Sequence, residues 1–120
     1  MEVKNNILQE KSFAFAVKVV NAYKDIVAKK SEYVLSKQFL KSGTSIGANV
    51  EEALGAQSTA EFLAKLSISY KEARECGYWI RLMRETGYLE KNLAENLLNE
   101  VTELQKIIAK IRITTKQNNI

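Results

Sequence analysis

Hydrophobic residues recur every three or four positions along most of the chain, the spacing that places them on one face of an α-helix. The pattern predicts four helices, over about residues 7–30, 32–56, 59–86 and 90–113. In the first helix the recurring positions are Phe13, Ala16, Val17, Val20, Tyr23 and Val27. In the fourth they are Leu97, Val101, Leu104, Ile108 and Ile111, the strictest repeat in the chain. We expect both sets to face the core.

Small and capping residues refine the second and third helices. The run Ser42-Gly43-Thr44-Ser45-Ile46-Gly47 could form a loop, because glycine costs a helix about 1 kcal/mol relative to alanine. The hydrophobic period keeps its phase across this run, so we predict one continuous helix whose small residues let a neighbouring helix approach closely. Ser58 and Glu61 fit a capping box at the start of the third helix, and Gly87 suits the left-handed position that ends it.

Short connections between long helices make sequential neighbours run antiparallel. The sequence therefore predicts one all-α domain, residues 1–120, folded as an antiparallel up-down-up-down four-helix bundle. The first and fourth helices lie side by side in such a bundle.

Composition restricts the chemistry open to the chain. Its 120 residues include no proline, no histidine and one cysteine, Cys76. Lack of histidine removes the commonest general base and metal ligand, and one cysteine cannot form an internal disulfide or a multi-cysteine zinc site. We therefore expect no enzyme activity, no cofactor and no metal site. The start of the chain resembles neither a signal peptide nor a membrane span, which predicts a cytoplasmic protein with no membrane partner.

Basic residues gather at the two ends of the sequence. Residues 1–41 hold eight lysines and four acids, residues 42–105 six bases and ten acids, and residues 106–120 four bases and no acid. If the first and fourth helices are neighbours, these ends form one anion-binding surface. Its candidate phosphate contacts are Lys11, Lys18, Lys106, Lys110, Arg112 and Lys116. The alternative is that the charges only keep the protein soluble.

A stripe of polar residues follows one side of the second helix. Ser45, Asn49 and Glu52 lie at steps of four and three, and Glu72 and Glu75 on the third helix are plausible partners. Buried polar groups have to be hydrogen-bonded, so we expect a structural polar network of these five residues. A site for magnesium or manganese built from the carboxylates is the less favoured alternative.

Three further side chains on the third helix have two possible roles each. Cys76 is most simply a small buried hydrophobic residue, since a nucleophilic cysteine needs a base. Tyr78 and Trp79 point about 100° apart, so both cannot face the core. Either one of them anchors another subunit, or one is in the core and the other is half covered.

Several segments resemble a known family. The runs from Ser42 to Ala53 and from Phe62 to Ala73, continuing to Tyr78-Trp79, resemble the second and third helices of the small four-helix-bundle family that includes the 23S rRNA-intervening-sequence proteins. Glu10 to Phe13 and Tyr33 to Gln38 fit its first helix and the start of its second. The likeness spans about residues 7–113.

The resemblance implies an antiparallel four-helix bundle, commonly assembled as a ring-like homopentamer. A distant relative is the accessory protein of diversity-generating retroelements, a basic pentamer that associates with nucleic acid and a reverse transcriptase. No catalytic residues carry over from the family, and the matching polar positions carry over only as determinants of folding or assembly.

These observations favour a non-enzymatic homo-oligomer that binds RNA or DNA through a basic surface on the first and fourth helices. Contacts to phosphates would make such binding independent of base sequence and sensitive to salt. The alternative is a protein–protein scaffold or adaptor whose charges serve solubility only.

Overall fold

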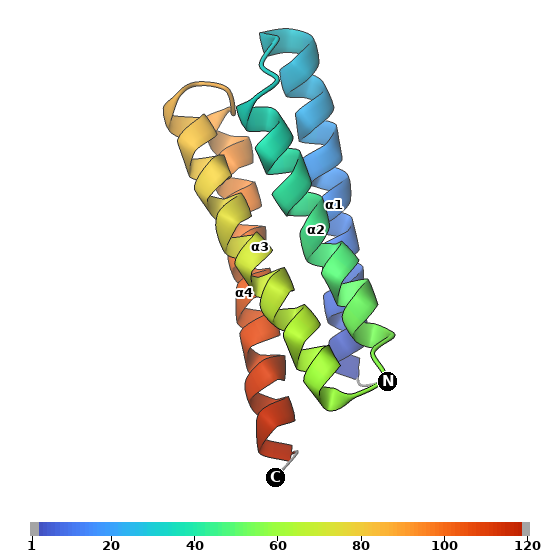
Figure 1. Cartoon of the computed structure of the whole chain (residues 1–120). Coiled ribbons are helices and arrows are strands. Elements are labelled where there is room, and N and C mark those ends of the chain that lie inside the picture. The colour runs from blue at the N-terminus through green and yellow to red at the C-terminus, as the bar shows by residue number, and fades with distance from the viewer. Residues whose placement is uncertain (1–2, 119–120) are drawn as a thin grey trace.

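A computed structural model describes residues 3–118, with the side chains of residues 7–118. It contains four α-helices, α1 (Val3–Lys30), α2 (Leu35–Leu54), α3 (Thr59–Glu85) and α4 (Lys91–Asn118), with no strand in the described part of the chain (Figure 1). The prediction of an all-α, four-helix protein is confirmed. The observed α2 is shorter than expected at both ends, and α4 continues past the expected end at residue 113.

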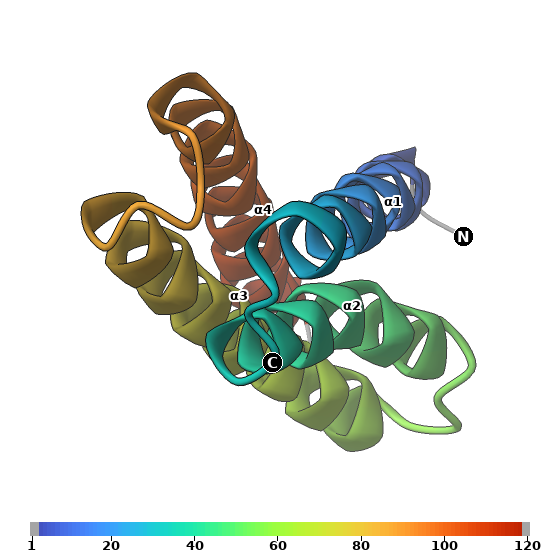
Figure 2. The ribbon, with the colours of Figure 1, turned by 90° about the horizontal axis from the view of Figure 1, so that it is seen from above.

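Neighbouring helices run in opposite directions, which the order of their contacts demonstrates. Contacts join α1 to α2 and α4, and join α3 to the same two helices, around a shared core (Figure 2). In every pair, residue numbers rise on one helix as they fall on the other. Between α1 and α2 the contacts are Ser12–Gly47 and Val19–Gly43, and between α2 and α3 they are Ile46–Ser69 and Glu52–Lys65. Between α3 and α4 they are Tyr70–Arg112 and Gly77–Val101, and between α1 and α4 they are Lys11–Glu103 and Lys18–Glu100.

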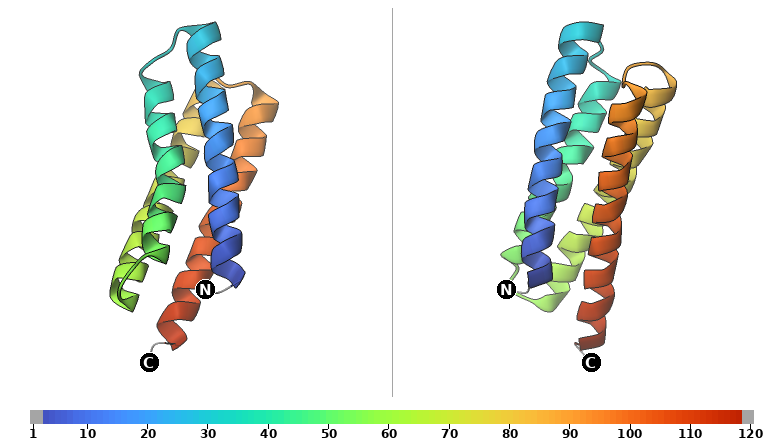
Figure 3. Two further views of the ribbon diagram at one scale, coloured as in Figure 1. Left: turned by 90° about the vertical axis from the view of Figure 1, so that its right-hand side faces the viewer. Right: turned by 180° about the vertical axis from the view of Figure 1, so that it is seen from behind.

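The bundle is elongated, with principal extents of 50 × 21 × 19 Å, and α1 lies beside α4 along its length (Figure 3). Burial of the apolar stripes of all four helices provides the main driving force for this packing. All five residues of the predicted α4 repeat are buried: Leu97, Val101, Leu104, Ile108 and Ile111.

The predicted core face of α1 is wrong. Its buried residues are Leu8, Ser12, Phe15, Val19, Ala22 and Ile26. Phe13 is 71% exposed, and Val17 and Val20 also face outward. Helix α1 carries apolar residues on more than one side, so two different sets of positions satisfy the helical period.

Helix α2 is continuous through its glycine run, as predicted. Gly43 and Gly47 face α1 at close approach: a Cβ added at Gly47 would lie 3.3 Å from the carbonyl oxygen of Ser12. The hydroxyl of Ser42 donates to the carbonyl oxygen of Gln38, 2.9 Å away, so this buried polar group is satisfied inside the helix.

The ends of α3 follow the sequence signals. The Ser58 hydroxyl oxygen accepts a hydrogen bond from the backbone N–H of Glu61 at 3.1 Å. Gly87, just past the C-terminus, has φ = +83°, a left-handed value that disfavours residues with a Cβ.

Candidate nucleic-acid interface

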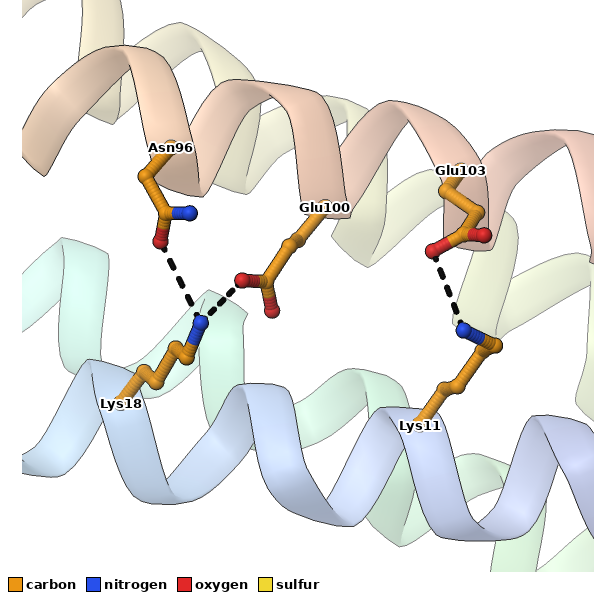
Figure 4. A network of polar contacts seen from close by, with 5 residues as sticks. All are labelled: Lys11, Lys18, Asn96, Glu100 and Glu103. Atoms are coloured by element: carbon orange, nitrogen blue, oxygen red, sulfur yellow. Dashed lines mark hydrogen bonds and ion pairs between the residues drawn. The ribbon is translucent and has the colours of Figure 1, made fainter.

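The two α1 lysines of the predicted basic surface point toward α4 and pair with its acids (Figure 4). The Lys11 ammonium lies 3.4 Å from a Glu103 carboxylate oxygen. Lys18 pairs with Glu100 and also donates a hydrogen bond to the amide oxygen of Asn96 at 3.3 Å. The acids neutralise much of the positive potential that the sequence predicted for this side of the bundle.

The four basic residues in the second half of α4 make no ion pair with any described side chain. They do not share one face, because an α-helix turns by about 100° per residue and so places Lys110 and Arg112 about 200° apart. Lys110 lines a hollow of about 180 Å³ on the α1 side, together with Ile7 and two α4 isoleucines. Arg112 lies on the α3 side, its guanidinium carbon 5.8 Å from the centre of the Tyr70 ring.

The predicted site is therefore brought together only in part. Helices α1 and α4 are neighbours, as expected, but Lys11 and Lys18 face carboxylates. Lys106, Lys110 and Lys116 are exposed on α4, while Arg112 is partly buried against α3.

The polar residues predicted on α2 are satisfied mostly within that helix. The hydroxyl of Ser45 donates to the carbonyl oxygen of Lys41 at 2.6 Å, and the side-chain amide of Asn49 donates to the carbonyl oxygen of Ser45 at 2.8 Å. Glu52 reaches across to α3, where its carboxylate lies 2.6 Å from the ammonium of Lys65.

The two α3 glutamates of the predicted network have different surroundings. Glu75 accepts a hydrogen bond from the indole N–H of Trp79 at 3.0 Å. Burial raises the pKa of Glu72, and the charge of Glu75 adds to this rise while Lys41 on α2 opposes it. Among side chains 7–118, the bond between Asn49 and Ser45 is the single hydrogen bond that joins two of the five predicted residues.

The structure has an apolar groove between α1 and α2 that the sequence analysis did not predict. It has a volume of about 480 Å³ and is lined by Gln9, Ser12, Phe13, Ala16, Thr44, Gly47, Ala48 and Glu51. The side-chain amide of Gln9 donates to a Glu51 carboxylate oxygen at 2.7 Å and so links the two helices beside it. The only sequence signal was the second set of apolar residues on α1, which we had assigned to the core.

The aromatic pair on α3 divides between core and solvent. Trp79 packs on the edge of the core and is partly buried, whereas Tyr78 is 50% exposed. Their rings meet edge to face, with centroids 5.1 Å apart and planes inclined by 74°.

A family model described as 23S rRNA-intervening sequence protein matches residues 4–110. The chain belongs to this family. The resemblance carried by the glycine run and the third helix is thus confirmed.

A solved relative supports this family membership. The chain is similar to a crystal structure of a protein with unknown function from the S23 ribosomal protein family of Bacteroides thetaiotaomicron. The two are 46% identical, with a TM-score of 0.90, over 92% of this chain and 98% of that one. None of the curated proteins matches the sequence.

Neither the family description nor the relative indicates a class of reaction. Burial raises the pKa of the Cys76 thiol to about 12, so this family member holds its cysteine in an unreactive, protonated form. The described residues contain no cluster of three or more acids or cysteines arranged to hold a metal ion. Across the same residues, no helix is apolar over a long enough stretch to cross a membrane.

Proposed function

We propose that this member of the 23S rRNA-intervening sequence protein family is a non-enzymatic scaffold that assembles from identical copies through the outer face of α1. The observation that carries the proposal is the exposure of Phe13, Val17 and Val20, which lie at steps of four and three along one side of α1. Contiguous apolar side chains exposed on a monomer are typical of an interaction surface, because covering them releases ordered water.

The groove beside Phe13 supports the same proposal. An interface needs both a protruding side chain and a hollow that accepts one, and residues of α1 and α2 supply the two next to each other. We propose a ring-like homopentamer, the assembly that the family resemblance implies, acting in the cytoplasm as the sequence predicts.

Light scattering on the purified chain, with and without nuclease treatment, tests the scaffold. A mass near five times the 13.6 kDa of one chain is expected under both conditions. Phe13→Glu places a carboxylate on the proposed interface and should yield monomers with unchanged helix content. Ile113→Glu makes the same change at an exposed apolar residue of α4 and should leave the assembly intact. A monomeric wild type would contradict the proposal.

Nucleic-acid binding is a second candidate function. The basic side chains of α4 that make no ion pair with a described side chain favour it. We propose that Lys106, Lys110 and Lys116 contact phosphates. Arg112 contributes less because it is partly buried against α3, and Lys11 and Lys18 contribute less because of their acidic partners. Several copies in one assembly would multiply weak contacts.

Fluorescence anisotropy with a structured RNA, from low to physiological salt, tests the second function. Affinity should fall steeply as salt rises, because binding displaces counterions from the phosphates. Absence of binding at low salt would rule this function out and leave the scaffold untouched.

A further inference from the structure

We infer that the outer face of α3 binds single-stranded nucleic acid, with phosphates on Lys71, Arg74 and Arg81 and a base stacked on Tyr78. The inference rests on the second function proposed above and names a different surface for it, one that sequence reasoning did not identify.

The four residues form one exposed stripe. They lie at steps of three, four and three along α3, and all are exposed to solvent. At about 1.5 Å per residue, the stripe is about 15 Å long. A stacked strand advances about 3.4 Å per nucleotide, so the stripe matches about four nucleotides.

The positive charges of this stripe are not neutralised by ion pairs. Lys71, Arg74 and Arg81 pair with no acid among side chains 7–118. Two nearby acids of α3 make their close contacts with other side chains: Glu75 accepts the Trp79 indole N–H and remains anionic, and Glu85 pairs with Arg84 at 3.1 Å. The stripe therefore differs from the α1–α4 side, where both predicted lysines face carboxylates.

The Tyr78 ring is held in place by its neighbours. It packs edge to face against Trp79, which is fixed by its bond to Glu75 and by contact with the core. The guanidinium of Arg81 lies 6.0 Å from the centre of the Tyr78 ring. A half-exposed ring with little freedom loses little entropy when a base stacks on it, and the adjacent cation is placed for the phosphate.

Aromatic and basic residues interleaved along one groove or stripe favour a single strand over other polyanions. An acidic protein or a duplex satisfies the charges, but a duplex keeps its bases stacked inside and offers none to Tyr78. Single strands combine phosphate contacts with stacking, and this stripe provides both.

Two triple variants of the full chain test the site by removing the same charge from different surfaces. The first is Lys71→Gln, Arg74→Gln and Arg81→Gln, and the second is Lys106→Gln, Lys110→Gln and Lys116→Gln. The probe is a fluorescein-labelled, unstructured oligoadenylate RNA, titrated by anisotropy at several salt concentrations. The α3 triple should bind at least about tenfold more weakly at low salt and reduce the logarithmic salt slope by about two, since each single-strand phosphate contact contributes about 0.7. The α4 triple should change both quantities much less on this single-stranded probe, although it should weaken binding of the structured RNA that we propose for the α4 lysines.

Tyr78→Ala tests the stacking part. It should weaken binding of the single strand by about tenfold and leave binding of a duplex unchanged, whereas Tyr78→Phe should retain wild-type affinity. Circular dichroism and light scattering on every variant confirm that helix content and assembly are preserved.

Three results would overturn the inference. An α4 triple that loses as much affinity as the α3 triple, or more, removes the site from α3 but leaves nucleic-acid binding standing. A Tyr78→Ala variant with wild-type affinity removes the stacked base. A wild-type protein that binds neither the oligoadenylate RNA nor the structured RNA at low salt overturns the second proposed function and this inference together.

Discussion

Gly43 and Val19 meet where α2 packs against α1, at a separation that leaves no room for a side chain on the glycine. A Cβ added at Gly43 would lie 2.7 Å and 2.8 Å from the two methyl carbons of Val19. Val19 is fully buried, and its branched Cβ makes it stiff about χ1, so it cannot turn aside. Together with Gly47, one turn further along, Gly43 sets the close spacing of the two helices.

We predict that Gly43→Ala destabilises the fold by about 1–2 kcal/mol. Overpacking a tight core contact costs about 1–3 kcal/mol, and the better helix propensity of alanine returns up to about 1 kcal/mol. Chemical denaturation measures the change in the free energy of unfolding. In a Val19→Ala background, which removes both methyl groups, the same substitution should cost little.

Gly77 provides the matched control for this prediction. It also lies inside a helix, but a Cβ added there would be 3.8 Å from the nearest atom, a methyl carbon of Val101, which is ordinary contact. Gly77→Ala should therefore stabilise the protein by about 0.5–1 kcal/mol through helix propensity alone. If both substitutions change stability in the same direction, close approach is not the reason for glycine at position 43.

The buried face of α4 was predictable from the sequence, because its apolar residues form one clear stripe. The α4 repeat from Leu97 to Ile111 is buried throughout. The glycine run of α2 was correctly predicted as helix, since Ile46 and Val50 keep the phase set by Phe39.

The buried face of α1 was not predictable from its period alone. Phe13 and Phe15 both belong to helical repeats of apolar residues, and their sides of the helix are about 200° apart. Only the packing of α2 and α4 decides that Phe15 is buried and Phe13 exposed. The residues that carry our assembly proposal were therefore first assigned to the core.

The basic surface was predicted from the numbers of charged residues in each segment. Such numbers do not show which side chain lies opposite each charge. That α1 and α4 lie side by side followed from the bundle topology. That Glu100 and Glu103 would lie opposite Lys18 and Lys11 depends on the axial register of the two helices, which the sequence does not encode locally. The α3 stripe was missed because its three bases lie in the segment of net negative charge.

Glu32 caps α2, a role that the sequence analysis also missed. Its carboxylate accepts hydrogen bonds from the backbone N–H groups of Val34 and Leu35, both at 2.9 Å, and of Ser36 at 2.7 Å. Burial alone would raise the pKa of Glu32, but these backbone bonds outweigh it and lower the pKa below the ordinary value.

We predict that Glu32→Ala lowers the free energy of unfolding by about 1 kcal/mol at neutral pH, as loss of a helix cap does. Because the folded pKa is depressed, the stabilisation is complete above the unfolded pKa and disappears as pH falls through the folded value. Urea denaturation at pH 7 and at acidic pH should show the difference between wild type and variant shrinking. Glu95→Ala, at an exposed acid within α4, should show no comparable effect at either pH. A Glu32→Ala difference that stays constant with pH would contradict the capping role.

Cys76 makes stability depend on pH at the alkaline end. Burial raises the pKa of its thiol from an ordinary value of 9.0 to about 12. Above about pH 9 the unfolded chain loses this proton and the folded chain keeps it, so stability should fall by about 1.4 kcal/mol per pH unit. Comparing wild type with Cys76→Ala from pH 8 to pH 10 isolates this slope from the titration of lysines and tyrosines. If the free energy of unfolding falls equally steeply with pH in wild type and Cys76→Ala, or if the native thiol is labelled rapidly at pH 8, Cys76 is accessible to solvent.

The two ion pairs between α1 and α4 should contribute unequally to stability. Lys18 has two partners, Glu100 and Asn96, and the Glu100 side chain is 29% exposed, against 53% for Glu103 in its pair with Lys11. Exposed pairs contribute about 0.2–1 kcal/mol, and water screens the more exposed one more strongly. Double-mutant cycles with alanine at Lys18 and Glu100, and at Lys11 and Glu103, should give a larger coupling for the first pair. Adding salt should reduce both couplings, and a larger coupling for the second pair would mean that α1 and α4 pack in a different register from the one observed.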